Sequence, residues 1–363
     1  MAKRVSVDKW LFTVTLLLVF IGLVMVFSAS AVMAKERFGS PYGFLLRQMA
    51  WAAAGIVAMV VVMNIDYRQF RRPSVVFTFL GFTSLLLIAV FLFRDSHNTH
   101  RWIKFDGFSF QPSELAKPAT ILYLAYFLES RWQAIADWKH VLLPAAAPTM
   151  LFALLIVKEP DLGTAIACMA ISTAVLFVAG MNMKYLWYGL AASALPLYLL
   201  IVRVPWRWAR VQAWFDPFKD PQGKGFHIIQ SMIAVSTGGL TGLGLMEGKQ
   251  KLFYLPEPHT DFIFAVTAEE LGLWGSLLVV TLFAFFLYRG VRTALRTEDM
   301  FAKFLATGIT AMVVVQALFN ISVVLAIMPA KGIPLPFISY GGSSLFITLA
   351  SVGVLLNITQ QTD

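Results

Sequence analysis

Apolar residues in this chain fall into long blocks separated by short polar segments. The hydrocarbon core of a bilayer is about 30 Å thick and needs about 20 apolar residues per helix. Ten blocks fit that length, so we predict an all-α integral membrane protein with about ten transmembrane helices. The predicted spans are 11–33, 46–64, 74–93, 112–129, 141–157, 162–180, 185–202, 262–288, 304–328 and 342–358.

The basic residues between these blocks predict an orientation. The loops on the N-terminal side hold more Lys and Arg than the short loops on the opposite side. Because short cytoplasmic loops carry the positive excess, both termini are expected in the cytoplasm. One long connection, about 203–261, then forms a large extracytoplasmic loop between helices seven and eight, and long loops are exempt from this rule.

The long connection carries an aromatic and basic segment that we expect to be ordered. Aromatic rings favour the membrane interface and cations attract lipid phosphate, so this segment should lie on the outer headgroup layer. Within one predicted polytopic domain, 1–363, this long outer loop is the main non-spanning part. The aromatic residues are Trp206, Trp208, Trp214, Phe215, Phe218 and Phe226.

Composition supports a membrane protein and argues against a nucleic-acid partner. The chain is 58% apolar and 13% charged, against roughly 25% charged residues in a typical soluble domain. The net charge of +9 is spread between the apolar blocks instead of forming one basic cluster. The single cysteine, Cys168, lies inside an apolar block, so no disulfide framework is expected.

Charged residues beside membrane spans are costly unless paired, which makes them functional candidates. Glu114 and Lys117 are three residues apart at the outer end of the fourth predicted helix and share a helix face. They could form an internal ion pair or bind substrate, with Lys117 holding a phosphate. Both readings remain open from the sequence.

Two outer segments place aspartates at helix starts. Asp161 precedes the sixth predicted helix, where an N-cap is expected, although its carboxylate could also bind a cation or a sugar. Thr260 or Asp261 is a candidate cap for the eighth helix. Glu269 and Glu270 should then lie about 12 Å deeper along that helix, paired with Lys117 or with backbone groups.

The segment 331–344 contains two prolines and two adjacent glycines, which predicts a non-helical excursion. Such backbone is tolerated at membrane depth only against protein or a wet cavity. Its glycines would allow a ligand to approach, and hydroxyls such as Ser339 and Ser343 could bind sugar or phosphate. A rigid structural hairpin is the alternative.

Taken in order, these motifs closely resemble the SEDS family of peptidoglycan glycosyltransferases, which has an elongation branch and a division branch. With the ten-helix layout they cover almost the whole chain. The segments that carry the resemblance are Arg101-Trp102-Ile103, Gln111 to Lys117, Glu159 to Thr164, Asp216-Pro217 with Gly223 to Gln230, Gly238 to Gly244, Leu255 to Phe264, and Lys331 to Ser344.

The resemblance implies a lipid II polymerase of the bacterial cytoplasmic (inner) membrane. Lipid II, a disaccharide-pentapeptide on undecaprenyl pyrophosphate, would be joined to a nascent glycan strand on the outer face. The family's catalytic aspartate lies in a His-Thr-Asp-Phe-Ile-Phe segment and corresponds to Asp261 here. Membrane lipids and a class B penicillin-binding transpeptidase are the other implied partners.

We hypothesise that Asp261 acts as general base on the acceptor sugar's 4-hydroxyl. Cations would stabilise the leaving pyrophosphate, and a divalent cation, Mg²⁺ or Mn²⁺, could share that work. A helix start near cations should depress the pKa of Asp261. The candidate substrate-binding residues are Lys117, Glu114, Arg101, Arg207, Arg210, Asp161, Lys331, Ser339 and Ser343.

Two other functions remain compatible with the sequence. A lipid II flippase would use polar residues inside the bundle as a headgroup path, and a non-catalytic scaffold for cell-wall synthesis would mainly recruit a partner. Within the family, Lys331 and the Glu-Leu-Ala-Lys and Glu-Glu-Leu-Gly forms favour the division branch over the cell-shape branch.

Overall fold

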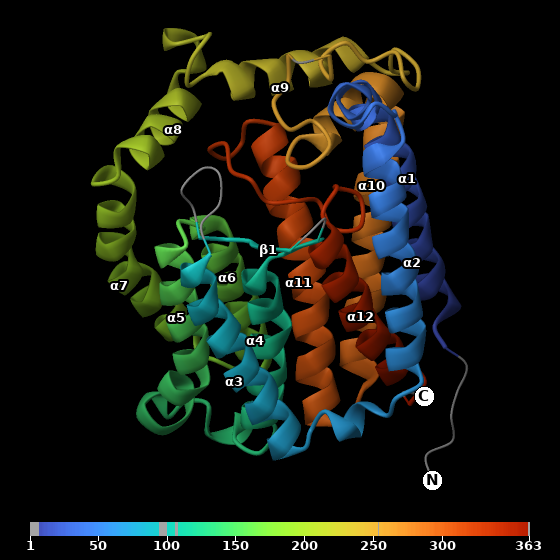
Figure 1. The fold of residues 1–363 in the computed structure, drawn as a ribbon. Coiled ribbons are helices and arrows are strands. Elements are labelled where there is room, and N and C mark those ends of the chain that lie inside the picture. Colours follow the sequence, from blue (N-terminus) through green and yellow to red (C-terminus); the bar gives the residue numbers. More distant parts are fainter. Residues whose placement is uncertain (1–6, 94–99, 106–107, 253, 362–363) are drawn as a thin grey trace.

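The computed structural model describes residues 7–93, 100–105, 108–252 and 254–361 (Figure 1). Each predicted span coincides with a helix, which confirms the helical membrane architecture. These helices are α1 (Lys9–Phe38), α2 (Gly43–Met63), α3 (Pro73–Ala89), α4 (Pro112–Glu129), α5 (Leu143–Lys158), α6 (Leu162–Val178), α7 (Met183–Val202), α10 (Ile263–Arg296), α11 (Met300–Val324) and α12 (Gly342–Thr359).

Within the described part of the chain, eight helices are long and apolar enough to cross a membrane by length and composition. The other two predicted spans are α4, which carries three charged residues, and α6, which has 17 residues. Both pack among other helices of the bundle. The count of ten spans and their orientation therefore stay predictions.

The bundle core depends on close approach between helices. α12 packs along α2, and α11 lies against α10, α4 and α6. A Cβ on Gly353 of α12 would lie 2.6 Å from the Met59 carbonyl oxygen of α2, and one on Gly308 of α11 would lie 2.4 Å from the Ile121 side chain of α4. Small residues let the backbones approach, as is common between membrane helices.

The start of α1 and the end of α12 lie at the same end of the bundle. Asp8 caps α1 through the Trp10 and Leu11 amides, and its own N–H donates to Thr359 Oγ1 at 3.2 Å. Its carboxylate also pairs with Arg289 near the end of α10. This arrangement agrees with termini on one side of the membrane.

The long outer connection is ordered and helical, as expected from its aromatic residues. α8 (Pro205–Phe215), the short η5 (Pro217–Lys219) and α9 (Phe226–Gly238) follow one another along it. In Figure 1 they continue from α7 and arch over one end of the bundle. No residue of α7 is fully buried, and only a few of its residues, such as Tyr185 and Leu186, pack against the bundle.

Two local features depart from the predicted all-α pattern. A two-stranded antiparallel hairpin, β1 (Ile103–Phe105) and β2 (Phe108–Phe110), precedes α4. Its strands are three residues each, too short for a period-two pattern to be distinctive.

The second departure is a break inside α10 at Gly272, which has φ 64° and ψ −159°. The preceding loop takes over the helix's hydrogen bonds: Leu243 N donates to Glu269 O at 3.0 Å, and Leu273 N donates to Gly239 O at 2.9 Å. The predicted span 262–288 is therefore wrong as a single helix. The apolar helix after the break extends to Arg296.

Candidate functional site

The loop before α10 and the segment between α11 and α12 are fastened to each other. Asn320 Nδ2 donates to the carbonyl oxygens of Asp261 and Ile333, both at 2.8 Å. Ser339 Oγ donates to Thr260 O at 2.5 Å and accepts from Leu335 N at 2.8 Å. The predicted non-helical excursion is confirmed, and its hydrogen bonds fix the chain on both sides of Asp261.

Asp261 does not cap a helix. α10 begins at Ile263, its N-cap position is Phe262, and no side chain caps it, so the expected cap at Thr260 or Asp261 is wrong. The carboxylate instead faces the backbone of the neighbouring segment, because a Cβ on Gly332 would lie 2.7 Å from Asp261 Oδ2. A larger residue at position 332 would therefore press on the Asp261 carboxylate and force it to move.

Lys331 directly precedes Gly332, which faces Asp261, and its side chain packs against the start of α6. A Cβ on Gly163 would lie 2.6 Å from Lys331 Cε, so the lysine stem packs on that glycine. Asp161 caps α6 as predicted, accepting from Thr164 N at 3.2 Å. Gln111 Nε2 also donates to Asp161 Oδ2 at 3.2 Å, which brings the start of α4 to the same place.

Three arginines belong to the same group of charged residues as Asp261, Asp161 and Lys331. Arg101 Nε donates to Glu159 O at 3.0 Å, and its guanidinium also donates to Pro160 O. On α8 the guanidinium carbons of Arg207 and Arg210 lie 5.0 Å and 5.2 Å from the Trp206 ring centroid. We call Asp261, Asp161, Lys331, Arg101, Arg207 and Arg210 the outer charged site, because their charges act on one another.

Burial dominates the electrostatics of the outer charged site. Burial, with the charge of Glu257 adding to it and that of Arg210 opposing it, raises the pKa of Asp261 to about 6. The expected depression of this pKa is wrong because desolvation outweighs the nearby cations. Burial likewise lowers the pKa of Lys331 to about 8, against the opposing charge of Asp161.

Glu114 and Lys117 form the internal ion pair that was one of their two predicted roles. Lys117 Nζ lies 2.7 Å from Glu114 Oε2, and the two side chains are 1% and 3% exposed. Their predicted contact with substrate stays a prediction. Ser339 uses its hydroxyl in the bonds given above, and Ser343 is buried at the start of α12.

Glu269 and Glu270 bind the outer loop rather than Lys117, which corrects their expected partner. Glu269 accepts from the Lys249 and Gln250 amides, the first at 2.8 Å. Glu270 pairs with Lys251 Nζ at 2.6 Å and accepts from Ser28 Oγ of α1. These carboxylates therefore hold the loop that leads to Asp261, and the expected backbone partners are confirmed.

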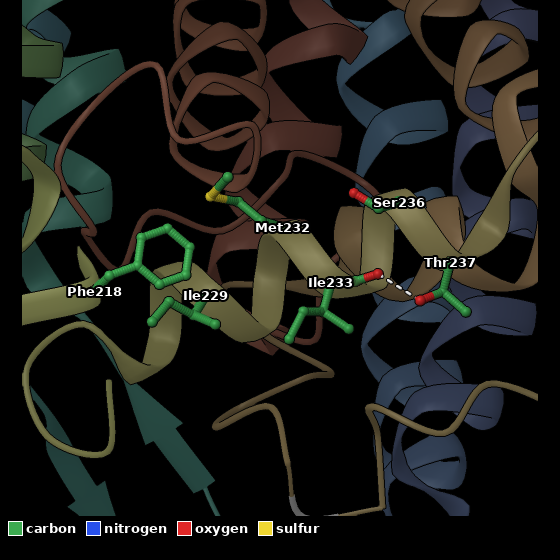
Figure 2. Close-up of a pocket in the computed structure, with 6 residues that line it drawn as sticks. All are labelled: Phe218, Ile229, Met232, Ile233, Ser236 and Thr237. Carbon is green, nitrogen blue, oxygen red and sulfur yellow. Dashed lines mark hydrogen bonds between the residues drawn. The ribbon is translucent and has the colours of Figure 1, made fainter. Parts of the chain in front are cut away.

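The described residues offer the outer charged site no cluster of metal ligands, and the apolar groove along α9 shares no residue with it. Among the described residues, no group of three or more His, Cys, Asp or Glu side chains could hold a metal ion. One apolar groove lies along α9 and is lined there by Ile229, Met232 and Ile233, with Phe218 at one end (Figure 2). None of these residues belongs to the outer charged site.

Comparison with known proteins identifies the family. Residues 8–363 match the FtsW/RodA/SpoVE family model, described as a cell cycle protein. The chain belongs to this family. Probable peptidoglycan glycosyltransferase FtsW of Geobacter metallireducens is 44% identical over 342 residues, covering 93% of this chain and 90% of that protein. Stage V sporulation protein E of Bacillus subtilis is 42% identical, covering 99% and 98%.

Solved structures of FtsW/RodA/SpoVE-like chains share this fold. A chain from a peptidoglycan synthase complex, solved to study how polymerization and crosslinking are coordinated, aligns with a TM-score of 0.80 at 29% identity, covering 97% of each chain. Thermus thermophilus rod shape determining protein RodA aligns with a TM-score of 0.72 at 27% identity, covering 99% of each. With its apolar helices, this family member is a multi-pass protein of the bacterial inner membrane.

Sequence reasoning missed several residues that shape the site. Asn320 stands inside an apolar span, and that placement was the available signal for a structural role. Glu257, four residues before Asp261 in the same loop, raises the pKa of Asp261 and was not predicted as a site residue. Glu159 is fully buried, although its neighbours in the sequence suggest a polar turn.

Proposed function

We propose that this chain is a peptidoglycan glycosyltransferase that polymerises lipid II into glycan strands at the outer face of the inner membrane. The relatives named as peptidoglycan glycosyltransferases cover nearly its full length. The observation that carries the proposal is the placement of Asp261, a desolvated carboxyl that lies against Gly332 and within the field of Arg101 and Arg210.

Asp261 would act as the general base. The acceptor sugar's 4-hydroxyl oxygen forms a bond to the anomeric carbon of the donor, and the bond from that carbon to the lipid pyrophosphate breaks. The hydroxyl proton passes to Asp261. A pKa of about 6 keeps the carboxylate ionised at neutral pH while making it a stronger base than an ordinary aspartate.

The cations of the outer charged site would stabilise the departing pyrophosphate. The charge of Arg210 acts on Asp261, and the charges of Asp161 and Arg207 act on Lys331, so positive charge is in place around the two aspartates. Charge that is already in place stabilises an anion as it develops. A divalent cation stays a prediction. Because no group of three ligands occurs among the described residues, such an ion would depend on the substrate's phosphates for most of its contacts.

The partner and the branch are part of this proposal. A class B penicillin-binding transpeptidase would crosslink the strands, supported by the likeness to a chain of a peptidoglycan synthase complex. The division or sporulation branch is supported by identities of 44% and 42% to FtsW and stage V sporulation protein E, against 27% to RodA.

Polymerisation of purified lipid II by the Asp261→Asn protein tests the function. Asn keeps the size of the side chain but cannot accept the proton, so glycan synthesis should fall by at least about 100-fold, the usual contribution of a general base. The control is Glu36→Gln on the exposed end of α1, which should polymerise normally. Near-normal synthesis by a folded Asp261→Asn protein would contradict the proposed role.

The same assay separates the rival functions. A flippase or a scaffold without catalysis would give no glycan from lipid II even in the wild-type protein with its partner present. Such a result would sink the polymerase proposal as a whole.

A further inference from the structure

Glu159 lies beside the outer charged site, and its carboxyl group has no partner there. It follows α5 directly and precedes Pro160 and Asp161 in the turn that leads to α6. The residue is 0% exposed. Among the described residues neither of its carboxyl oxygens has a hydrogen-bond partner.

Arg101, the cation whose charge acts on Glu159, is engaged elsewhere on the same turn. Arg101 donates from Nε to the main-chain carbonyl of Glu159 at 3.0 Å and from its second nitrogen to the carbonyl of Pro160. It therefore holds the backbone of the turn and not the Glu159 carboxyl. Asp161, the other charged group acting on Glu159, is a like charge whose own oxygens cap α6 and accept from Gln111.

An ionised Glu159 would be unstable in this position. A buried carboxylate needs a cation or several hydrogen-bond donors, and here it would meet neither while facing a second carboxylate. Burial, with the charge of Asp161 adding to it and that of Arg101 opposing it, raises the pKa of Glu159 to about 9. The lack of hydrogen-bond partners and the raised pKa both indicate that the Glu159 side chain is neutral at pH 7.

We propose that Glu159 is a protonated positioning residue of the transferase site, whose neutral carboxyl leaves Arg101 bound to the carbonyls of the 159–161 turn. From that position the charge of Arg101 acts on Asp261 and Lys331. Loss of the Glu159 proton creates a buried anion beside Arg101 and draws the guanidinium away from the carbonyls. The turn, the cap of α6 and the field on Asp261 then change together.

Infrared spectroscopy tests the protonation state without any assay of activity. Glu159→Gln is nearly isosteric with the neutral acid and should fold like the wild type. The wild-type minus Glu159→Gln difference spectrum at pH 7 should contain the carbonyl stretch of a protonated carboxylic acid, and raising the pH through about 9 should remove it. A carboxylate band at pH 7 in its place would overturn the proposal.

Lipid II polymerisation tests the positioning role, and this arm rests on the proposed function. The ratio of Glu159→Gln to wild-type activity should be near 1 at pH 7 and rise to about tenfold one pH unit above the midpoint, because only the wild type loses the neutral form. Taking the ratio cancels the titration of Lys331, which both proteins share. A ratio that stays constant with pH would overturn the role of Glu159 while leaving the protonation result and the polymerase proposal intact.

A matched substitution guards against a general effect of removing a carboxyl group. Glu36→Gln changes an exposed glutamate on α1. It should lack the protonated-acid band in its own difference spectrum and give a flat activity ratio. A pH-dependent ratio of the same size in Glu36→Gln would show that the effect is not specific to Glu159, and would also overturn the proposal.

Discussion

At the scale of single residues, the outer charged site contains an acid and a base whose pKa values are displaced toward each other. Asp261 is raised to about 6 and Lys331 is lowered to about 8, in both cases chiefly by burial. Catalysis as proposed needs the ionised form of each. Both are ionised together only between these two values.

This predicts a bell-shaped pH profile for polymerisation. Activity should rise through about pH 6 as Asp261 loses its proton and fall through about pH 8 as Lys331 loses its charge. Lys331→Arg keeps a cation that does not deprotonate in this range, so it should shift the alkaline limb upward. An alkaline limb in the same place in Lys331→Arg would assign that limb to another group.

Asp261 should also limit the stability of the protein. Its folded-state pKa lies above its ordinary value of 3.8, so the ionised form is disfavoured on folding. The resulting penalty is absent below about pH 3.8 and complete above about pH 6. A shift of one unit corresponds to about 1.4 kcal/mol, so Asp261→Asn should raise the free energy of unfolding at pH 7 by up to about 3 kcal/mol, less any part screened by solvent.

Thermal unfolding in detergent checks this prediction, because Asp261→Asn should melt above the wild type at pH 7 and close to it at pH 4, where most of the penalty is absent. Equal melting temperatures at pH 7 would mean that the Asp261 carboxylate is better solvated than its surroundings indicate.

Asp161 and Asp261 show which properties of a single residue can be predicted from the sequence. Asp161 caps α6 as expected, because a cap depends on three neighbouring residues and on little else. The direction of the Asp261 pKa shift was predicted wrongly. It depends on how deeply the 325–341 segment buries the carboxylate, and that packing is not local.

At the scale of elements, the loop 238–251 and the break in α10 form one unit. A Cβ on Gly242 would lie 2.0 Å from Glu270 O, and Gly242 has φ +79°. Gly242→Ala should therefore lower the free energy of unfolding by more than about 2 kcal/mol, combining backbone strain with a clash against main chain. Gly81→Ala on α3, which has open space around it, should melt at or above the wild-type temperature.

The buried ion pair in this unit gives a second prediction. Glu270→Gln leaves Lys251 buried without its carboxylate, so it should cost about 3–5 kcal/mol. Adding Lys251→Met removes the stranded ammonium and should restore much of the loss. Thermal unfolding of both variants checks this, and a single variant as stable as the double would show that Lys251 finds another partner.

The same unit marks the limit of prediction at the element scale. Apolar length was enough to predict ten helices, because a spanning helix needs little beyond about 20 apolar residues. It was not enough to find the break at Gly272. That break exists because Gly239 and Leu243 supply replacement hydrogen bonds from elsewhere in the chain.

At the scale of the whole molecule, the distribution of Lys and Arg in the loops and the fold both place the termini at one end of the bundle and the long connection at the other. Asp8, Arg289 and Thr359 meet at one end of the bundle, where the termini were predicted to lie in the cytoplasm. The connection with α8 and α9 arches over the end that carries the 325–341 segment (Figure 1). The outer charged site should therefore face the periplasmic side.

Labelling of single cysteines tests this orientation. Cys168 is fully buried and can be replaced by Ala as a background. A membrane-impermeant maleimide should then label Lys224→Cys in the long connection of intact spheroplasts. Glu298→Cys, between α10 and α11, should react only after the membrane is permeabilised, although both positions are exposed on the protein. The reverse pattern would place Asp261 on the cytoplasmic side, where a chain growing into the wall could not be made.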